Sequence, residues 1–328
     1  MSGQRAIAPA FVNDALQCVR RNCLDERKLL ARVGLPPSVV EPISPEQYGA
    51  LWRAIADALD DEFFDEGNRP MRVGSFSLLS HAILSTKNLE HALRRMLRFL
   101  RVVIDEPYGE LVVENGLAQI VLKDSARDRP AFAYRTYWII VYGLASWLVG
   151  RSIPLRQADF RCGPPPRRVH YPLFYGAPIQ FNQPTSRLAF DAEYLRLPTI
   201  RNERSLRDFL KKAPANILIR SRHDDGIAEK IREILRKAPP ATWPTFETLA
   251  AEMRVPEPTL RRRLRHEKQT YRDLKDDVRR KLAVQMIMTS RQNIADLAAD
   301  LGFSEPSAFY RAFRKWTGVT PSTFRHSV

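Results

Sequence analysis

The chain has 328 residues, a formal net charge of +15 and a sequence pI near 10.0. Charged residues make up 27% and hydrophobic residues 44%, which are ordinary globular values that exclude wholesale disorder. Three cysteines cannot build a disulfide framework. The N-terminus has no apolar run of signal-peptide length, and the longest apolar stretch, Tyr137–Gly150, is too short to span a bilayer. Since roughly 150 residues make one domain, we expect a soluble, cytoplasmic, two-domain protein without a metal ion, cofactor or membrane contact.

Residues 1–200 are expected to form one α+β domain. Apolar residues at helical spacing predict helices over Phe11–Val33, Pro45–Asp60, Leu89–Val103 and Ala131–Val149. Asn115-Gly116 predicts a hairpin over Leu111–Leu122, because Asn-Gly between β-branched residues is the strongest short hairpin signal. Further extended pieces are expected at Ala158–Arg161 and Arg187–Phe190. This order of elements favours helices packed on an antiparallel sheet over alternating βαβ units.

The helix expected over Ala131–Val149 concentrates aromatic side chains and one positive charge. Most of these aromatics are expected in the core. If the domain binds a small-molecule effector, the contacts expected from this helix are Tyr134, Arg135 and Trp138. Arg135 suits an anionic effector, because a buried guanidinium needs a partner.

Residues 201–222 are expected to connect this domain to a second one. The segment is rich in charge, and Pro214 stops its helical pattern, which suits a helix followed by a linker. We therefore expect the second domain at residues 223–328.

The C-terminal third is denser in positive charge and repeats itself. Residues 220–328 hold 22 basic and 14 acidic residues, with basic runs at Arg261–His266, Arg279–Lys281 and Arg311–Lys315. The pattern Leu249–Met253 returns at Leu297–Leu301, an offset of 48 residues that becomes 49 in the following helix. Repetition at this spacing indicates a duplicated supersecondary unit.

Each copy is predicted to be a helix, a tight turn and a second helix. The first copy has helices over Thr245–Met253 and from Glu257 to about Glu267, with a turn at Arg254-Val255. In the second copy, Gly302 ends the first helix, Ser304 is expected to cap the next, and Pro306 lies in its first turn. Such a pair forms a helix-turn-helix, whose second helix enters the DNA major groove.

One long helix is expected between the two copies, over Tyr271–Met288. Its predicted apolar stripe comprises Leu274, Val278, Leu282 and Met286. A rigid spacer of this kind would hold two recognition helices at a fixed separation. DNA requires this, since successive major-groove entries on one face lie about 34 Å apart.

The second copy also carries a dense motif set. The turn Gly302-Phe303-Ser304, the helix Phe309–Lys315 and the ending Gly318-Val319-Thr320-Pro321 occur together and in order. With them, the segment from Asp224 to Arg325 resembles the C-terminal region of AraC/XylS-type transcription regulators. The resemblance implies a tandem helix-turn-helix domain that binds double-stranded promoter DNA. It also implies RNA polymerase as a partner, and it allows a homodimer.

Mapped residue by residue, the resemblance places base contacts at Arg261 and Arg262 in the first recognition helix and at Ser307 and Arg311 in the second. This chain departs from the pattern at Pro258, where relatives often carry a contacting polar or aromatic residue. Arginine can donate two parallel hydrogen bonds to guanine, which discriminates by ~1–3 kcal/mol. Phosphate contacts add affinity but carry no sequence information. The residues expected to make them lie further along each helix and are Arg265, Arg314 and Lys315.

Weaker motifs in the first domain point to the same group of regulators. They are Gly74-Ser75, Leu89–Leu93, Trp147–Arg151, Phe174–Phe181, Phe190-Asp191 and Leu195–Pro198. In order and spacing they resemble the arabinose-binding-like N-terminal domain of one branch of the family. The resemblance implies an effector domain that is not a cupin, and it says nothing of sugar specificity.

Two other functions are alternatives to an effector-controlled regulator. An enzyme is disfavoured, because the sequence has no Gly-x-Ser-x-Gly elbow, no phosphate-binding glycine loop and no His-Glu-x-x-His. A DNA-binding regulator whose N-terminal domain only dimerises stays open. A ligand-dependent change in thermal stability would separate it from an effector-sensing regulator.

Overall fold

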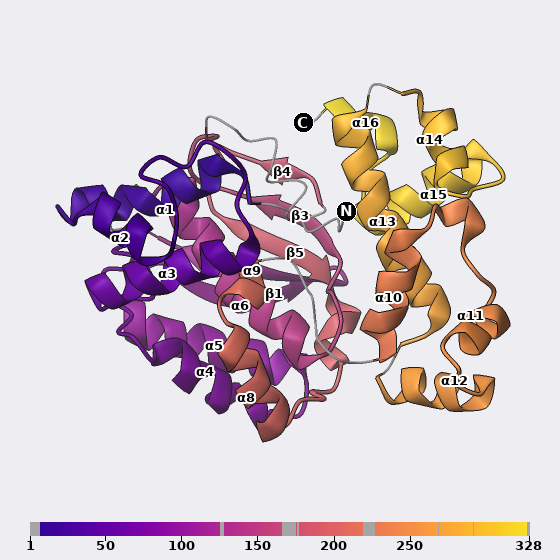
Figure 1. Ribbon diagram of the computed structural model, residues 1–328, viewed down its shortest axis with the longest axis horizontal. Coiled ribbons are helices and arrows are strands. Elements are labelled where there is room, and N and C mark those ends of the chain that lie inside the picture. Colours follow the sequence, from indigo (N-terminus) through magenta and orange to yellow (C-terminus); the bar gives the residue numbers. More distant parts are fainter. Residues whose placement is uncertain are drawn as a thin grey trace. The chain divides into compact units, whose positions relative to one another are not determined.

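The computed structural model describes residues 7–124, 128–165, 175, 177–218, 227–267, 269–290 and 292–326 (Figure 1). Part of the Phe174–Phe181 motif and the last four residues of the expected linker lie outside these ranges. The chain forms two compact units, one mainly from residues 1–153 and 180–222, the other mainly from residues 223–328. Among the described residues, no helix has the length and apolar character to cross a membrane.

The first unit opens with five helices: α1 Pro9–Arg21, α2 Glu26–Arg32, α3 Pro45–Leu59, α4 Ser75–Leu84 and α5 Leu89–Ile104. The helical spacing over Phe11–Val33 is therefore split into two elements. Cys23 takes a left-handed φ of +52° at the break, and the Asp25 side chain accepts a hydrogen bond from the Lys28 N–H at 3.0 Å to cap α2. Helix α3 begins at Pro45 as predicted, behind a capping box formed by Ser44 and Gln47.

The sheet contains the predicted hairpin. Strands β1 Tyr108–Glu114 and β2 Leu117–Lys123 pair antiparallel, and Asn115 and Gly116 have φ values of +51° and +76°. Both values are left-handed, as a type I′ turn requires. Strand β5 Arg187–Asp191 pairs antiparallel with β2, and the full order is β1-β2-β5-β3-β4 with β3 at Leu155–Asp159 and β4 at Ile179–Gln180. The predicted α+β fold is confirmed, although β3 begins three residues before the predicted strand.

Helix α6, Ala131–Leu148, forms the centre of the first core. Nearly all of its residues are buried, and it packs against α4, α5 and α9 (Ala215–Leu218). The Gly109 N–H of β1 donates to the Tyr137 hydroxyl at 2.9 Å. A Cβ at Gly109 would lie 2.7 Å from the Cδ2 of Leu97 in α5 and 3.0 Å from the Tyr137 hydroxyl, so a larger residue there would require these side chains to shift. The 3₁₀ helix η1, Ala192–Arg196, and α8, Glu203–Lys212, precede α9.

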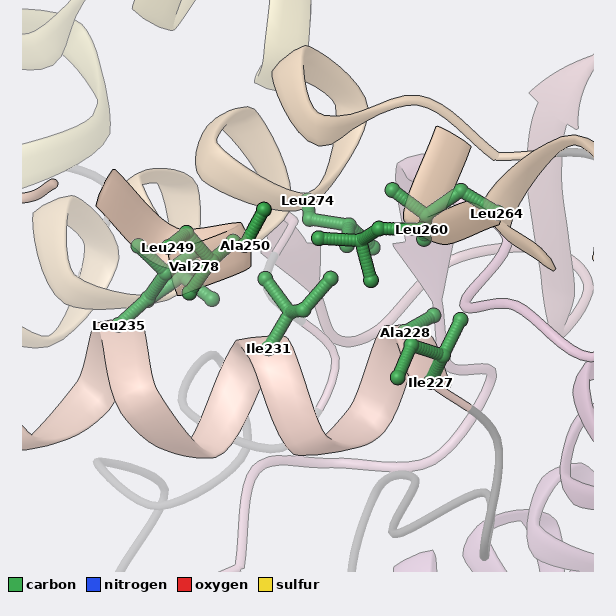
Figure 2. Packing of buried hydrophobic residues seen from close by; sticks show 10 residues of the cluster. All are labelled: Ile227, Ala228, Ile231, Leu235, Leu249, Ala250, Leu260, Leu264, Leu274 and Val278. Atoms are coloured by element: carbon green, nitrogen blue, oxygen red, sulfur yellow. The ribbon is translucent and has the colours of Figure 1, made fainter. Parts of the chain in front are cut away.

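The second unit is helical. Its elements are α10 Ile227–Lys237, η2 Pro240–Thr242, α11 Phe246–Glu252, α12 Glu257–His266, α13 Tyr271–Thr289, α14 Ile294–Asp300, α15 Pro306–Thr317 and α16 Pro321–His326. Figure 2 shows the first of its two apolar clusters, in which Ile227, Ile231 and Leu235 of α10 point toward side chains of α11, α12 and α13. The spacing of these three residues places them on one face of α10.

The second cluster uses the other half of α13. Ala283, Val284 and Ile287 of α13 pack with α14, α15 and α16, and Leu282 packs against both clusters. The predicted stripe holds for its first half only, because Met286 is half-buried while Ile287 is buried. At about 100° per residue, Ile287 lies about 220° around α13 from Leu274, so the second cluster packs on a different face of the helix from the first.

Candidate functional site

The two helix-turn-helix copies have matching turns. Arg254 ends α11 with φ +52°, and Gly302 ends α14 with φ +75°. In the first turn the Val255 N–H donates to Ala250 at 3.0 Å, and the equivalent bond of the second turn measures 2.9 Å. Glycine adopts a left-handed φ without steric cost, whereas for arginine the same conformation is strained. The duplication predicted from sequence is therefore present in the backbone.

The predicted cap of the second recognition helix is wrong by one residue. Glu305 is the N-cap of α15 and its side chain makes no capping bond, while Pro306 occupies the first turn. Ser304 lies one residue outside. Proline has a φ suited to the first helical position, so the cap is the residue directly before it.

Helices α12 and α15 each divide into a buried apolar face and an exposed polar face. Leu260 and Leu264 of α12 are buried, as are Phe309 and Phe313 of α15. All seven side chains predicted to contact DNA are exposed: Arg261, Arg262 and Arg265 on α12, and Ser307, Arg311, Arg314 and Lys315 on α15. The structure thus brings these residues together on two helices, on the sides that do not pack into the unit.

The repeat pairs individual positions of the two helices. At the offset of 49 residues, Arg262 corresponds to Arg311 and Arg261 corresponds to Tyr310. The Arg261 guanidinium forms an ion pair with Glu257 and lies 4.9 Å over the ring of Phe246. The equivalent tyrosine shares a hydrogen bond of 3.1 Å with the Ser322 hydroxyl. This position is tied to its own unit in both copies. On α15, the Ser307 hydroxyl donates to the Glu305 carboxylate at 3.1 Å.

The basic run Arg279–Lys281 faces inward and not outward. Asp277 of the same helix accepts contacts from Lys281 at 2.9 Å, Arg280 at 3.2 Å and Arg232 of α10 at 3.3 Å. Burial alone would raise the pKa of Asp277, but the three cations hold it well below its ordinary value. Burial lowers the pKa of Lys281 to about 8. This run therefore contributes an internal ion cluster.

Arg279 joins the two helix-turn-helix copies. Its Nε donates to the Leu301 carbonyl at 2.9 Å, and its guanidinium lies 5.0 Å over Trp243 and 5.1 Å over Phe303. Trp243 packs on the first apolar cluster and Phe303 on the second. Burial lowers the pKa of Arg279. Together with α13, this side chain holds the two copies in one arrangement. In the sequence, the signal for the Asp277 ion cluster was the spacing of four residues between Asp277 and Lys281, which favours an ion pair on a helix.

The first unit contains cavities that the sequence did not locate. One of about 510 Å³ is lined by Tyr134, whose hydroxyl donates to Asp124 at 2.6 Å and whose pKa is raised by burial. Arg135 is buried, with Asp14 at 3.2 Å and the Phe11 ring at 4.2 Å. Trp138 is fully buried beside Tyr137. The three residues expected to contact an effector thus lie at one cavity wall, at an internal ion pair and in the core.

Known proteins resemble both parts of the chain. Residues 24–199 match the family described as the arabinose-binding domain of AraC transcription regulators, and residues 249–327 match a helix-turn-helix family. The ornithine utilization regulator of Pseudomonas aeruginosa is 30% identical over 259 residues, 78% of this chain and 76% of that protein. The regulator VqsM of the same organism is 35% identical over 102 residues, 31% of each chain.

A solved structure also aligns along nearly the whole chain. The transcriptional regulator CdpR from Pseudomonas aeruginosa covers 96% of this chain and 98% of its own, at 20% identity and a TM-score of 0.33. The family assignment rests on the two domain matches, in sequence order, and on the relative aligned over most of both chains. The chain belongs to the AraC family of DNA-binding transcription regulators.

Proposed function

We propose that this regulator is controlled by a small-molecule effector and acts in the cytoplasm on promoter DNA, without enzymatic activity. The proposal that the protein binds promoter DNA rests on the equivalence of α12 and α15 in the two copies of the repeat. Each has a buried apolar face and an exposed basic face, and both pack against the single helix α13. Two recognition helices on one rigid support suit two successive major grooves.

The proposed division of contacts follows chemistry and position. Bases are read by Arg261 and Arg262 on α12 and by Ser307 and Arg311 on α15, while Arg265, Arg314 and Lys315 bind phosphates. Arg262 and Arg311 support this assignment, since the repeat places them at the same exposed point of each helix. Arginine there can form the bidentate contact with guanine.

The proposed domains are an effector-sensing and dimerising domain at 1–200, a linker at 201–222 and the DNA-binding domain at 223–328. Tyr134, Arg135 and Trp138 are proposed effector contacts on α6. In support, Tyr134 lines the 510 Å³ cavity, and an anionic effector would compete with Asp14 for Arg135. A homodimer and contact with RNA polymerase complete the proposal.

The geometric test needs only DNA variants. One protomer is expected to protect two asymmetric elements whose centres lie about 10 bp apart, because the two helices present different side chains. Inserting about half a helical turn, 5 bp, moves the second element to the opposite face of the duplex and should abolish two-headed binding. A full-turn insertion controls for the added length. Unchanged affinity after the half-turn insertion would mean that only one helix-turn-helix reads DNA.

Effector control has its own test. A metabolite that binds the folded N-terminal domain should raise the thermal stability of the protein and also change its DNA affinity, since the two equilibria are linked. A broad metabolite screen in which neither quantity moves would favour the alternative regulator, whose N-terminal domain only dimerises.

A further inference from the structure

A second cavity of the first unit, about 240 Å³, lies among α3, α4, α6, α8 and α9. Its apolar wall is formed by Trp52, Phe64, Phe76, Ile140, Leu210 and Ile217. Trp52 and Phe64 meet edge to face with ring centroids 4.7 Å apart, so the wall is well packed. An apolar cavity of about 150 Å³ admits benzene. This one therefore has room for a ring and a short tail.

One side of the cavity is the end of the first unit. Ala213, Pro214 and Ile217 line it, and α9 is the last helix of this unit among the residues that the structure describes. Helix α9 rests on two glycines. A Cβ at Gly49 of α3 would lie 2.9 Å from the Ala215 nitrogen, and one at Gly143 of α6 would lie 3.1 Å from the Cβ of Ile217. Helix α9 thus packs too closely against α3 for any residue larger than glycine at position 49.

Two charged side chains line the same cavity. The Glu62 carboxylate is already occupied, since it accepts the N–H groups of Gly74 at 3.0 Å and Phe76 at 2.6 Å at the start of α4. Arg53 is exposed and donates one hydrogen bond, at 2.5 Å, to the Ala213 carbonyl. A guanidinium has five N–H donors, and it binds a carboxylate more strongly than a neutral carbonyl. Arg53 is therefore the group that a ligand would meet.

We propose that this cavity binds a small carboxylate with an apolar body, and that its carboxylate draws Arg53 away from Ala213. The residue that ends α8, two positions before α9, then loses its hydrogen bond to α3, and the connection through α9 to the DNA-binding domain changes. The proposal rests on the effector control proposed above, but it names a site separate from the α6 cavity that Tyr134 lines.

Binding is tested by calorimetry on the full chain with 3-phenylpropionate as the probe. Phenethylamine, which has a similar body and the opposite charge, is the control ligand and should not bind. Arg53→Gln should weaken probe binding about tenfold or more, as loss of a hydrogen bond between charged groups does. Arg207→Gln makes the same change of charge on an exposed residue of α8 outside the cavity wall, so it should bind like the wild type.

Ala56→Leu fills the cavity from α3, where Ala56 is 8% exposed, and should abolish binding. Thermal unfolding checks that this variant folds. Arg53→Gln alters an exposed side chain and keeps the test valid if Ala56→Leu does not fold. Absence of probe binding at millimolar concentration, equal binding of phenethylamine, or full binding by Arg53→Gln would each overturn the site.

The regulatory step is tested by DNA affinity with and without the probe. The probe should change wild-type affinity by about fivefold or more, as coupled sites commonly do. Arg53→Gln and Gly49→Ala, which disturb α9 without ligand, should shift affinity in the same direction, and Arg53→Gln should no longer respond to the probe. Probe binding that leaves DNA affinity unchanged would overturn the α9 switch and leave control through α6 intact. A metabolite that acts equally on Ala56→Leu would show effector control without this cavity and overturn its regulatory role.

Discussion

Replacing Asp277 by Asn tests whether the ion cluster stabilises the DNA-binding domain. Asp277 is the shared acidic partner of Lys281, Arg280 and Arg232, at 2.9, 3.2 and 3.3 Å. The four side chains are between 3% and 15% exposed. Asn keeps the shape and one acceptor oxygen but leaves three buried cations without this negative charge. Removing one partner from a buried ion pair costs about 3–5 kcal/mol, and the retained oxygen favours the lower end of that range.

Native-state hydrogen exchange of α13 measures the effect in the full chain. A loss of about 3 kcal/mol makes the protected amides exchange about 100-fold faster. Asp276→Asn is the matched control, because its carboxylate is 43% exposed and lies 3.7 Å from Arg279. Because the Asp276 carboxylate is open to solvent, we expect its pair with Arg279 to contribute about 1 kcal/mol or less. If the two variants exchanged at the same rate, the cluster would not be a stabilising element and the reasoning from burial would fail.

The remaining predictions concern pH, the two turns and DNA readout. The pKa of Asp277 is lower in the folded protein than in the unfolded chain. The stability that Asp277 contributes is therefore complete above about pH 4 and is lost as the pH falls toward the folded pKa. Urea titrations should show the wild type losing its stability advantage over Asp277→Asn on acidification from neutral pH. Gly302→Ala should cost about 1–2 kcal/mol, because φ is +75° there. Arg254→Gly should be neutral or stabilise the protein by up to about 1 kcal/mol, because removing the strain of a left-handed arginine offsets the greater freedom that glycine gives the unfolded chain. If thermal melts showed Gly302→Ala to be more stable than Arg254→Gly, the two turns would not be equivalent. Arg311→Ala should relax preference at one base position and cost ~1–3 kcal/mol on the cognate site, whereas Lys315→Ala should weaken binding to all DNA alike. Selection from random DNA with each variant checks this assignment, and an unchanged base preference for Arg311→Ala would refute it. For the wild type, each phosphate contact should make the slope of log affinity against log salt about 0.9 more negative.

Local patterns predicted most of the helical elements and the hairpin. Asn115-Gly116 was enough for the turn between β1 and β2, because only a left-handed pair fits there. The repeat likewise predicted both helix-turn-helix copies, including the stop at Gly302. Where two local signals compete, prediction was poorer: Pro306 displaced the expected cap at Ser304, and the break before α2 depends on a left-handed Cys23 that no motif marks.

Contacts between distant segments could not be read from the sequence. In the sequence, Arg279–Lys281 is only a basic run, yet two of its members surround Asp277 together with Arg232, which lies 45 residues earlier. The cavity beside α9 draws its wall from five helices, so no local run of residues announces it. Exposure of the seven side chains proposed to contact DNA was predictable because each lies away from the buried apolar positions of its own helix.

Helix α13 takes part in both apolar clusters, and this limits the insertions and deletions that α13 can accept. One residue added between Val278 and Ala283 would rotate everything beyond it by about 100° and advance it by about 1.5 Å. The second recognition helix would then turn away from the DNA face, and the Arg279 contacts with Trp243 and Phe303 would be broken. Substitutions on α12 and α15 can alter each DNA element separately. Single insertions or deletions in α13 cannot adjust the distance between the elements without disrupting the domain, so the spacing should be common to all sites that the protein recognises.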